Sequence, residues 1–150
     1  DFARAYWHWF FLIQNAPLPE TMIGHDPDAY WRMKCCDTAD SNAPFAPAAL
    51  DEYLRAFRDP AAIHASCEDY RAAYGIDIEH DNADAGAKLA MPIQVLWGQR
   101  GVIERCFDCL SLWRVRADNV TGRALPCGHY MAEELPDQIT QAMRDFFRQS

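Results

Sequence analysis

His129 is the residue of this 150-residue chain whose neighbours best suit it to act as a base. It follows Gly128, which is expected to let the backbone turn tightly, and it comes directly after an expected strand at residues 121–126. A histidine at the carboxyl end of a strand in an open α/β sheet lies where such folds bind ligands, and a neutral imidazole can take a proton from water and return it. A lone Gly-His pair is more often a surface histidine in a loop. The strand, the Glu-x-Pro segment ending at Pro136 and the amphipathic helix that follows it together favour a catalytic role.

The elements that would position His129 alternate between strand and helix in the second half of the chain. Residues 91–98 form a short apolar run that ends in glycine, as a buried parallel strand does. A helix is expected over residues 103–113, and a weaker strand follows at 121–126. From Pro136 onward the apolar residues recur at helical spacing, at Ile139, Ala142, Met143, Phe146 and Phe147. This order predicts an α/β fold with a parallel sheet, and because two strands cannot bury both faces, the sheet must continue in something outside this chain.

The first half of the chain, residues 1–88, shows helical patterning and proline-marked turns without a clear alternating strand. Asp26-Pro27 and Asp59-Pro60 each look like a helix N-cap followed by proline at the first helical position. Pro47 is expected to begin a helix that continues through Arg58. An aromatic helical face is expected near the start, with Tyr6, Trp9, Phe10 and Ile13 at helical spacing. These short helices predict a small helical layer.

The composition limits the classes of partner. The chain has 22 acidic and 14 basic residues, for a formal net charge of −8, and half of its residues are hydrophobic. It is long enough for one compact domain, and its charge argues against nucleic acid or an anionic membrane as a partner, since phosphate binding needs clustered Lys and Arg. No apolar run approaches the length of a membrane span. The chain opens as if already inside an amphipathic helix, so we expect residue 1 to be an internal position of a longer protein.

Six cysteines could be disulfide partners, metal ligands or plain thiols. Cys106 and Cys109 have the CxxC spacing, but a zinc site would need a second pair at suitable spacing. Cys35 and Cys36 are adjacent, which suits neither a disulfide framework nor a zinc knuckle. Without a secretory signal, reduced thiols in a cytoplasmic protein are the expected state.

Several motifs resemble the fluoroacetate dehalogenases of the α/β-hydrolase superfamily over essentially the whole chain. Residues 6–20, YWHWFFLIQNAPLPE, resemble the first helix of that family's cap, and residues 67–72, CEDYRA, with the later EHD at 79–81, resemble a second part of it. The segments 96–98, LWG, and 128–136, GHYMAEELP, resemble the last two strand ends of the fold. Many α/β-hydrolases carry a triad Asp where Gly101 stands here, whereas the fluoroacetate dehalogenases take this acid from an earlier strand.

The resemblance implies a C-terminal half of the α/β-hydrolase fold, with a helical cap over residues 1–88 and the last two strands and helices of the core over 89–150. It implies that His8, Trp9 and Tyr70 bind the leaving halide and that His129 is the base. Their N–H and O–H groups suit fluoride, a strongly hydrated anion whose water must be replaced by fixed donors. Taken singly, Trp9 and Tyr70 could instead be cap core and His8 an interfacial histidine.

In that family an Asp carboxylate displaces halide from a haloacetate, and water activated by the histidine hydrolyses the resulting ester. The nucleophile, two substrate-binding arginines and the triad acid would lie upstream of this chain, so the chain alone is expected to be inactive. The resemblance implies no metal or organic cofactor, a small haloacid substrate, a cytoplasmic location and a homodimer. The alternatives are an epoxide hydrolase or another α/β-hydrolase, an inactive cap-containing fragment and, more remotely, zinc binding through Cys106 and Cys109.

Overall fold

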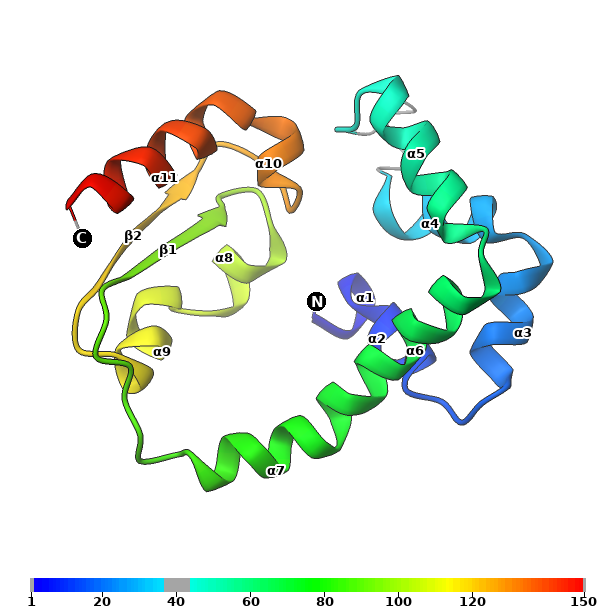
Figure 1. Ribbon diagram of the computed structural model, residues 1–150, viewed down its shortest axis with the longest axis horizontal. Helices are drawn as coiled ribbons and strands as arrows, with labels where there is room; N and C mark the ends of the chain where they lie inside the picture. Colours follow the sequence, from blue (N-terminus) through cyan, green and yellow to red (C-terminus); the bar gives the residue numbers. More distant parts are fainter. Residues whose placement is uncertain (1, 37–43, 150) are drawn as a thin grey trace. The chain divides into compact units, whose positions relative to one another are not determined.

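The computed structural model describes residues 2–36 and 44–149, and its backbone divides into two compact units (Figure 1). One unit is Ala3–Ala83, and the other runs from Asp84 to the end of the described chain and includes Phe2. The first unit is helical: α1 (Phe2–Ala5, which begins in the other unit), α2 (Trp7–Leu12), α3 (Leu18–His25), α4 (Pro27–Cys35), α5 (Pro47–Phe57), α6 (Pro60–Tyr74) and α7 (Ile76–Ala83).

Two of the helices in the first unit begin as the sequence predicts. The Asp26 carboxylate accepts a hydrogen bond of 2.9 Å from the Ala29 amide, and Pro27 is the first residue of α4. The Asp59 carboxylate accepts one of 2.9 Å from the Ala61 amide, and α6 begins at the proline that follows. A side-chain oxygen at the N-cap satisfies one of the backbone N–H groups that have no partner inside the helix, which fixes the start of the helix.

The sequence pattern did not predict a helix at Glu79, His80 and Asp81, but these residues belong to α7. None of the residues of α7 is buried, so this helix needs no stripe of apolar residues to pack against a core, and its sequence has none at helical spacing. Sequence periodicity detects a helix by such a stripe, which explains the error.

The core of the first unit lies where α2, α3, α4 and α6 meet. Its buried residues are Leu12, Ile23, Tyr30, Ile63 and Cys67, and Phe11, Phe57 and Tyr70 pack against them. Burial of these apolar surfaces is the main favourable contribution to the folding of such a unit.

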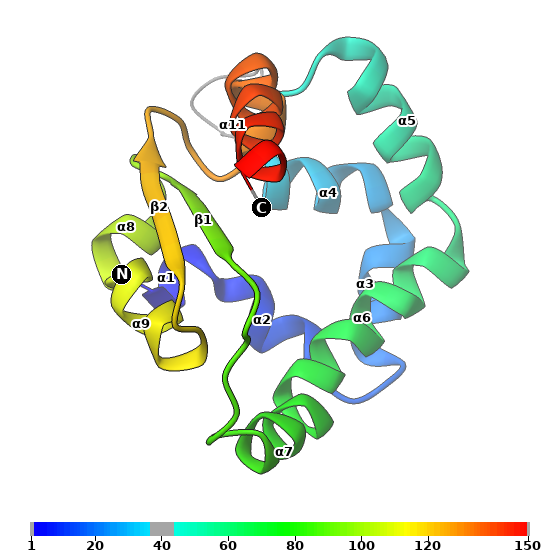
Figure 2. The ribbon, with the colours of Figure 1, turned by 60° about the vertical axis from the view of Figure 1, so that its left-hand side comes forward.

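The second unit is a two-stranded parallel sheet with helices (Figure 2). Its elements are β1 (Ile93–Gly98), α8 (Val102–Cys106), α9 (Cys109–Arg116), β2 (Val120–Leu125), α10 (Met131–Glu134) and α11 (Pro136–Gln149). The register runs from Ile93 opposite Val120 to Gly98 opposite Leu125, so the predicted parallel pairing is confirmed. Figures 1 and 2 show α8 and α9 on one side of the strands and α11 on the other.

The single helix expected over residues 103–113 is wrong, since the chain forms α8 and α9 with a break between them. Asp108 caps the second of these helices. Its carboxylate accepts hydrogen bonds from the Ser111 amide at 3.0 Å and from the Ser111 hydroxyl at 2.8 Å. An N-cap of this kind begins a new helix rather than continuing an old one.

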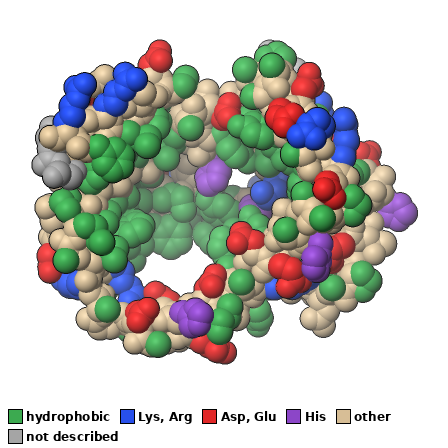
Figure 3. Space-filling model, viewed as in Figure 1, with side chains coloured by type: hydrophobic (Ala, Val, Ile, Leu, Met, Phe, Trp, Pro, Cys, Tyr) green, Lys and Arg blue, Asp and Glu red, His purple; other side chains and the backbone are tan. Residues whose placement is uncertain are grey.

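The surface of the described chain carries interspersed charges of both signs (Figure 3). The second unit also exposes large apolar side chains, including Val115 on α9 and Phe147 on α11. Among the described residues, no helix is both long and apolar enough to cross a membrane.

Candidate functional site

The structure brings His8, Trp9 and Tyr70 together within the first unit. His8 and Trp9 are consecutive residues of α2, and Tyr70 lies near the end of α6. The Tyr70 ring centroid is 5.7 Å from that of His8, at an interplanar angle of 82°, and 5.2 Å from that of Trp9, at 84°. Edge-to-face pairs at these distances are favourable for aromatic rings. The phenol ring is therefore in contact with both of the other rings.

Tyr70 is held from two sides. Its ring packs against the buried core of the unit, and the ammonium group of Lys34 lies 6.0 Å from the ring centroid. Burial, followed by the negative charge of Asp69, raises the pKa of the Tyr70 phenol above its usual range. The phenol is therefore protonated at neutral pH and available as a hydrogen-bond donor.

These three side chains offer three kinds of donor. A phenol donates O–H, an indole donates N–H and cannot accept, and an imidazole donates N–H from at least one nitrogen. His8 and Tyr70 are partly buried, and Trp9 is 41% exposed, so the cluster is open to solvent. A group of fixed donors without a carboxylate among them can stabilise a small anion.

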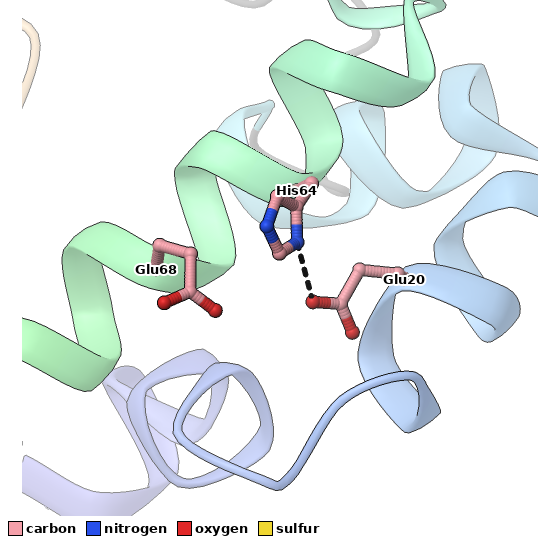
Figure 4. Close-up of side chains that lie close together, drawn as sticks. All are labelled: Glu20, His64 and Glu68. Carbon is pink, nitrogen blue, oxygen red and sulfur yellow. Dashed lines mark hydrogen bonds and ion pairs between the residues drawn. The ribbon is translucent and has the colours of Figure 1, made fainter.

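A network centred on Arg71 lies next to this cluster, and sequence reasoning did not find it. The Arg71 guanidinium donates to the Glu20 carboxylate at 2.7 Å and 3.1 Å, to the Gln14 carbonyl oxygen at 2.9 Å and also to Glu68. His64 Nδ1 also lies 3.2 Å from Oε1 of the Glu20 carboxylate (Figure 4). Hydrogen bonds from Arg71 lower the pKa of Glu20 to about 2.

The carboxylates of Glu20 and Glu68 and the imidazole of His64 come close enough to suggest a metal site, since their ligand atoms all lie within 4.8 Å of one another. Figure 4 shows their side chains converging from α3 and α6. Arg71 already supplies the positive charge, since it pairs with both glutamates. The cluster is therefore an ion-pair network between two helices.

His129 belongs to the second unit, in the loop between β2 and α10. Its side chain is exposed, and its ring lies 5.1 Å from that of Tyr130 at an interplanar angle of 86°. The residue before it, Gly128, donates its amide to the Glu134 carboxylate at 2.7 Å. A hydrogen bond from the residue that precedes His129 thus holds this loop to α10.

Arg100 adds further hydrogen bonds that hold the His129 loop. Its guanidinium donates to the Glu134 carboxylate at 3.0 Å and to the Pro126 carbonyl oxygen at 2.7 Å, and its amide donates to the Cys127 carbonyl oxygen at 2.9 Å. Glu134 is the last residue of α10, and its carboxylate binds the loop that carries His129. The Glu-x-Pro segment was the one sequence signal for this role, and nothing local pointed to Arg100.

Glycines allow β1 and the His129 loop to approach each other. A Cβ atom at Gly98 would lie 1.8 Å from the Gly128 carbonyl oxygen, so no side chain fits there. Gly128 itself does not have a positive φ, and a Cβ atom there would meet the Glu134 carboxylate at 2.8 Å. Its backbone conformation is thus one that other residues also adopt, and a side chain at this position would displace the end of the flexible Glu134 side chain.

All six cysteines are free thiols. Burial raises the pKa of Cys109 and Cys127, and it raises that of Cys67 to about 11. These three thiols are therefore protonated at neutral pH and poor nucleophiles. Cys106 and Cys109, the pair with the CxxC spacing, lie in different helices, α8 and α9.

Comparison with known proteins supports the predicted α/β-hydrolase fold. The chain is 41% identical to fluoroacetate dehalogenase from Burkholderia sp over 96% of its length, which is 48% of that protein. It is 31% identical to soluble epoxide hydrolase from Corynebacterium sp. (strain C12) over 93% of its length, again 48% of that protein. The chain thus spans about half the length of the curated relatives it matches, and no family model matches it.

A solved structure agrees with these matches. ALR0039 from Nostoc sp PCC 7120, provisionally described as an α/β hydrolase, superposes with a TM-score of 0.88 at 50% identity. The match covers 97% of this chain and 50% of that one. The predicted fold class is confirmed, and the matched relatives are hydrolases.

Proposed function

Since the chain has the fold of the C-terminal half of an α/β-hydrolase and is similar to fluoroacetate dehalogenase, we propose that the complete enzyme hydrolyses haloacetates. Fluoroacetate and water would give glycolate, fluoride and a proton. Residues of Ala3–Ala83 would form a cap that binds the halide, and the second unit would supply the base.

The observation that carries this proposal is the cluster of His8, Trp9 and Tyr70. The three side chains come from α2 and α6, and their rings are in contact. Fluoride holds its hydration water strongly, so a C–F bond breaks readily only where protein donors replace that water as the charge develops. An epoxide oxygen also gains negative charge as its ring opens, but it stays attached to the product and needs a proton rather than a site that receives a free halide ion.

The proposed reaction has two steps. A carboxylate oxygen of an Asp outside this chain attacks the α-carbon of the haloacetate, and the C–F bond breaks with its electron pair leaving on fluoride, toward the donors of His8, Trp9 and Tyr70. In the second step His129 takes a proton from water, and the hydroxide attacks the ester carbonyl. Glycolate leaves as an alkoxide and takes the proton held by His129, and the Asp, left as a carboxylic acid, releases its proton to solvent and becomes a carboxylate again.

The main alternative is an epoxide hydrolase, because the same region of the chain is 31% identical to one. The experiment is to supply the complete enzyme with fluoroacetate and, separately, with an epoxide. A fluoride electrode would follow the first reaction and diol formation the second. Fluoride release without diol formation is the expected result, whereas diol formation without fluoride release would replace the proposal with the alternative.

A further inference from the structure

Arg71 stands next to Tyr70 in the chain and joins three segments of the first unit. Its Nε donates to the Gln14 carbonyl oxygen at 2.9 Å, and its Nη1 and Nη2 donate to the Glu20 carboxylate at 2.7 Å and 3.1 Å. The side chains of Arg71 and Glu20 are only 17% and 16% exposed. A planar guanidinium that binds a carboxylate in this way fixes direction as well as distance.

The Gln14 contact reaches the segment that carries two of the proposed halide donors. Gln14 follows α2 by two residues, and its side-chain amide donates back to the Phe10 carbonyl oxygen at 2.7 Å. A cation at the carboxyl end of a helix also interacts favourably with the helix dipole. Arg71 therefore anchors the end of α2 to α6, and Glu20 adds α3 to the same anchor.

From this arrangement we infer that Arg71, held by Glu20, is a positioning residue for the proposed halide site, on which this inference rests. Successive residues of a helix point in directions about 100° apart, so Tyr70 and Arg71 leave α6 on different sides. Tyr70 meets His8 and Trp9, and Arg71 fixes the helix that carries those two residues. The contacts of Arg71 then help to hold α2 where the rings lie 5.7 Å and 5.2 Å apart.

The variant that tests this is Arg71→Lys in the complete enzyme. Lysine keeps the positive charge, but its single ammonium cannot reproduce the fork on Glu20 together with the bond to the Gln14 carbonyl oxygen. The matched control is Arg58→Lys. Arg58 makes a similar fork on Asp28, at 2.8 Å and 2.6 Å, between the end of α5 and α4, and neither helix carries any of the three rings.

Two measurements separate positioning from general stability. The first is the indole N–H resonance of Trp9 in ¹⁵N-tryptophan protein, assigned with Trp9→Phe, because ring-current shifts report how Trp9 lies on Tyr70. The second is the rate of fluoride release from fluoroacetate divided by that of chloride release from chloroacetate. A fold defect lowers both rates, whereas a displaced halide donor lowers the fluoride rate more, because fluoride depends more on its donors.

With Arg71→Lys we expect the Trp9 resonance to move and the fluoride-to-chloride ratio to fall by about 10- to 100-fold, the range expected for a misplacement near 1 Å. Arg58→Lys should change neither. An unmoved Trp9 resonance, or equal losses on both substrates, would overturn the inference.

If Arg71→Lys does not fold, Glu20→Gln takes its place. We then expect Glu20→Gln to move the Trp9 resonance and to lower the fluoride-to-chloride ratio, and an unmoved resonance or equal losses would overturn the inference. A wild-type enzyme that releases no fluoride would refute the proposed function. The Trp9 resonance would still show whether Arg71 positions α2.

Discussion

Gly98 ends β1 at a point where the backbone of the His129 loop leaves no room for a side chain. A Cβ atom there would lie 1.8 Å from the Gly128 carbonyl oxygen, whereas ordinary contact begins at 3.4 Å. Gly98→Ala therefore requires strand and loop to separate by about 1.6 Å, the difference between 3.4 and 1.8 Å. Gly98 does not have a positive φ, so the effect comes from space alone. Overpacking of this kind costs about 1–3 kcal/mol of stability.

His129 follows Gly128 directly, so a displaced loop displaces the proposed base. We expect Gly98→Ala to lower halide release by the complete enzyme by about 100-fold, as expected for a misplacement of 1 Å or more. Steady-state halide release and urea unfolding measure the two effects. Gly86→Ala is the control, since a Cβ atom there meets nothing within 4 Å. Wild-type turnover and stability in Gly98→Ala would refute the argument that the contact between Gly98 and Gly128 positions His129.

Two further substitutions test the first unit. Glu20 has a folded pKa of about 2 against an ordinary value of 4.5, so its ion pair with Arg71 stabilises the fold above pH 4.5 and is lost as the pH falls through 2. Glu20→Gln should therefore lower the free energy of unfolding by about 1–2 kcal/mol at pH 7, after allowance for solvent screening. Chemical denaturation at several pH values should show the difference between the variant and the wild type vanish between pH 4.5 and 2. A difference that stayed constant to pH 2 would contradict it. Trp9→Phe removes one donor and should lower fluoride release by roughly 100-fold but chloride release much less; equal losses on the two substrates would count against the halide site.

Sequence patterns predicted the elements whose causes are local. The Asp-Pro pairs at 26–27 and 59–60 begin helices because the cap and the proline act within one turn. The strand–helix–strand order predicted parallel pairing because a crossover connection allows little else. The break at Asp108 was missed because apolar spacing continues across it, although Ser111, which Asp108 binds as the N-cap, lies only three residues away.

The contacts that shape the two candidate sites are long-range, and local patterns do not contain them. Arg71 and Glu20 are 51 residues apart, and Arg100 and Glu134 are 34 apart. In the sequence alone, the residues of each pair cannot be told from ordinary exposed charged residues. The contact of Tyr70 with His8 and Trp9 was suggested by resemblance to a family and by no spacing rule, and their role in binding halide remains a proposal.

We propose that an Asp carboxylate displaces halide from the haloacetate and that water activated by His129 then hydrolyses the ester. The most direct test is intact-protein mass spectrometry of the complete His129→Asn enzyme after incubation with fluoroacetate. We expect stoichiometric release of fluoride, one carboxymethyl group bound as an ester to an Asp outside this chain, and little further turnover. Continued turnover at the wild-type rate, or fluoride release without any ester, would contradict it.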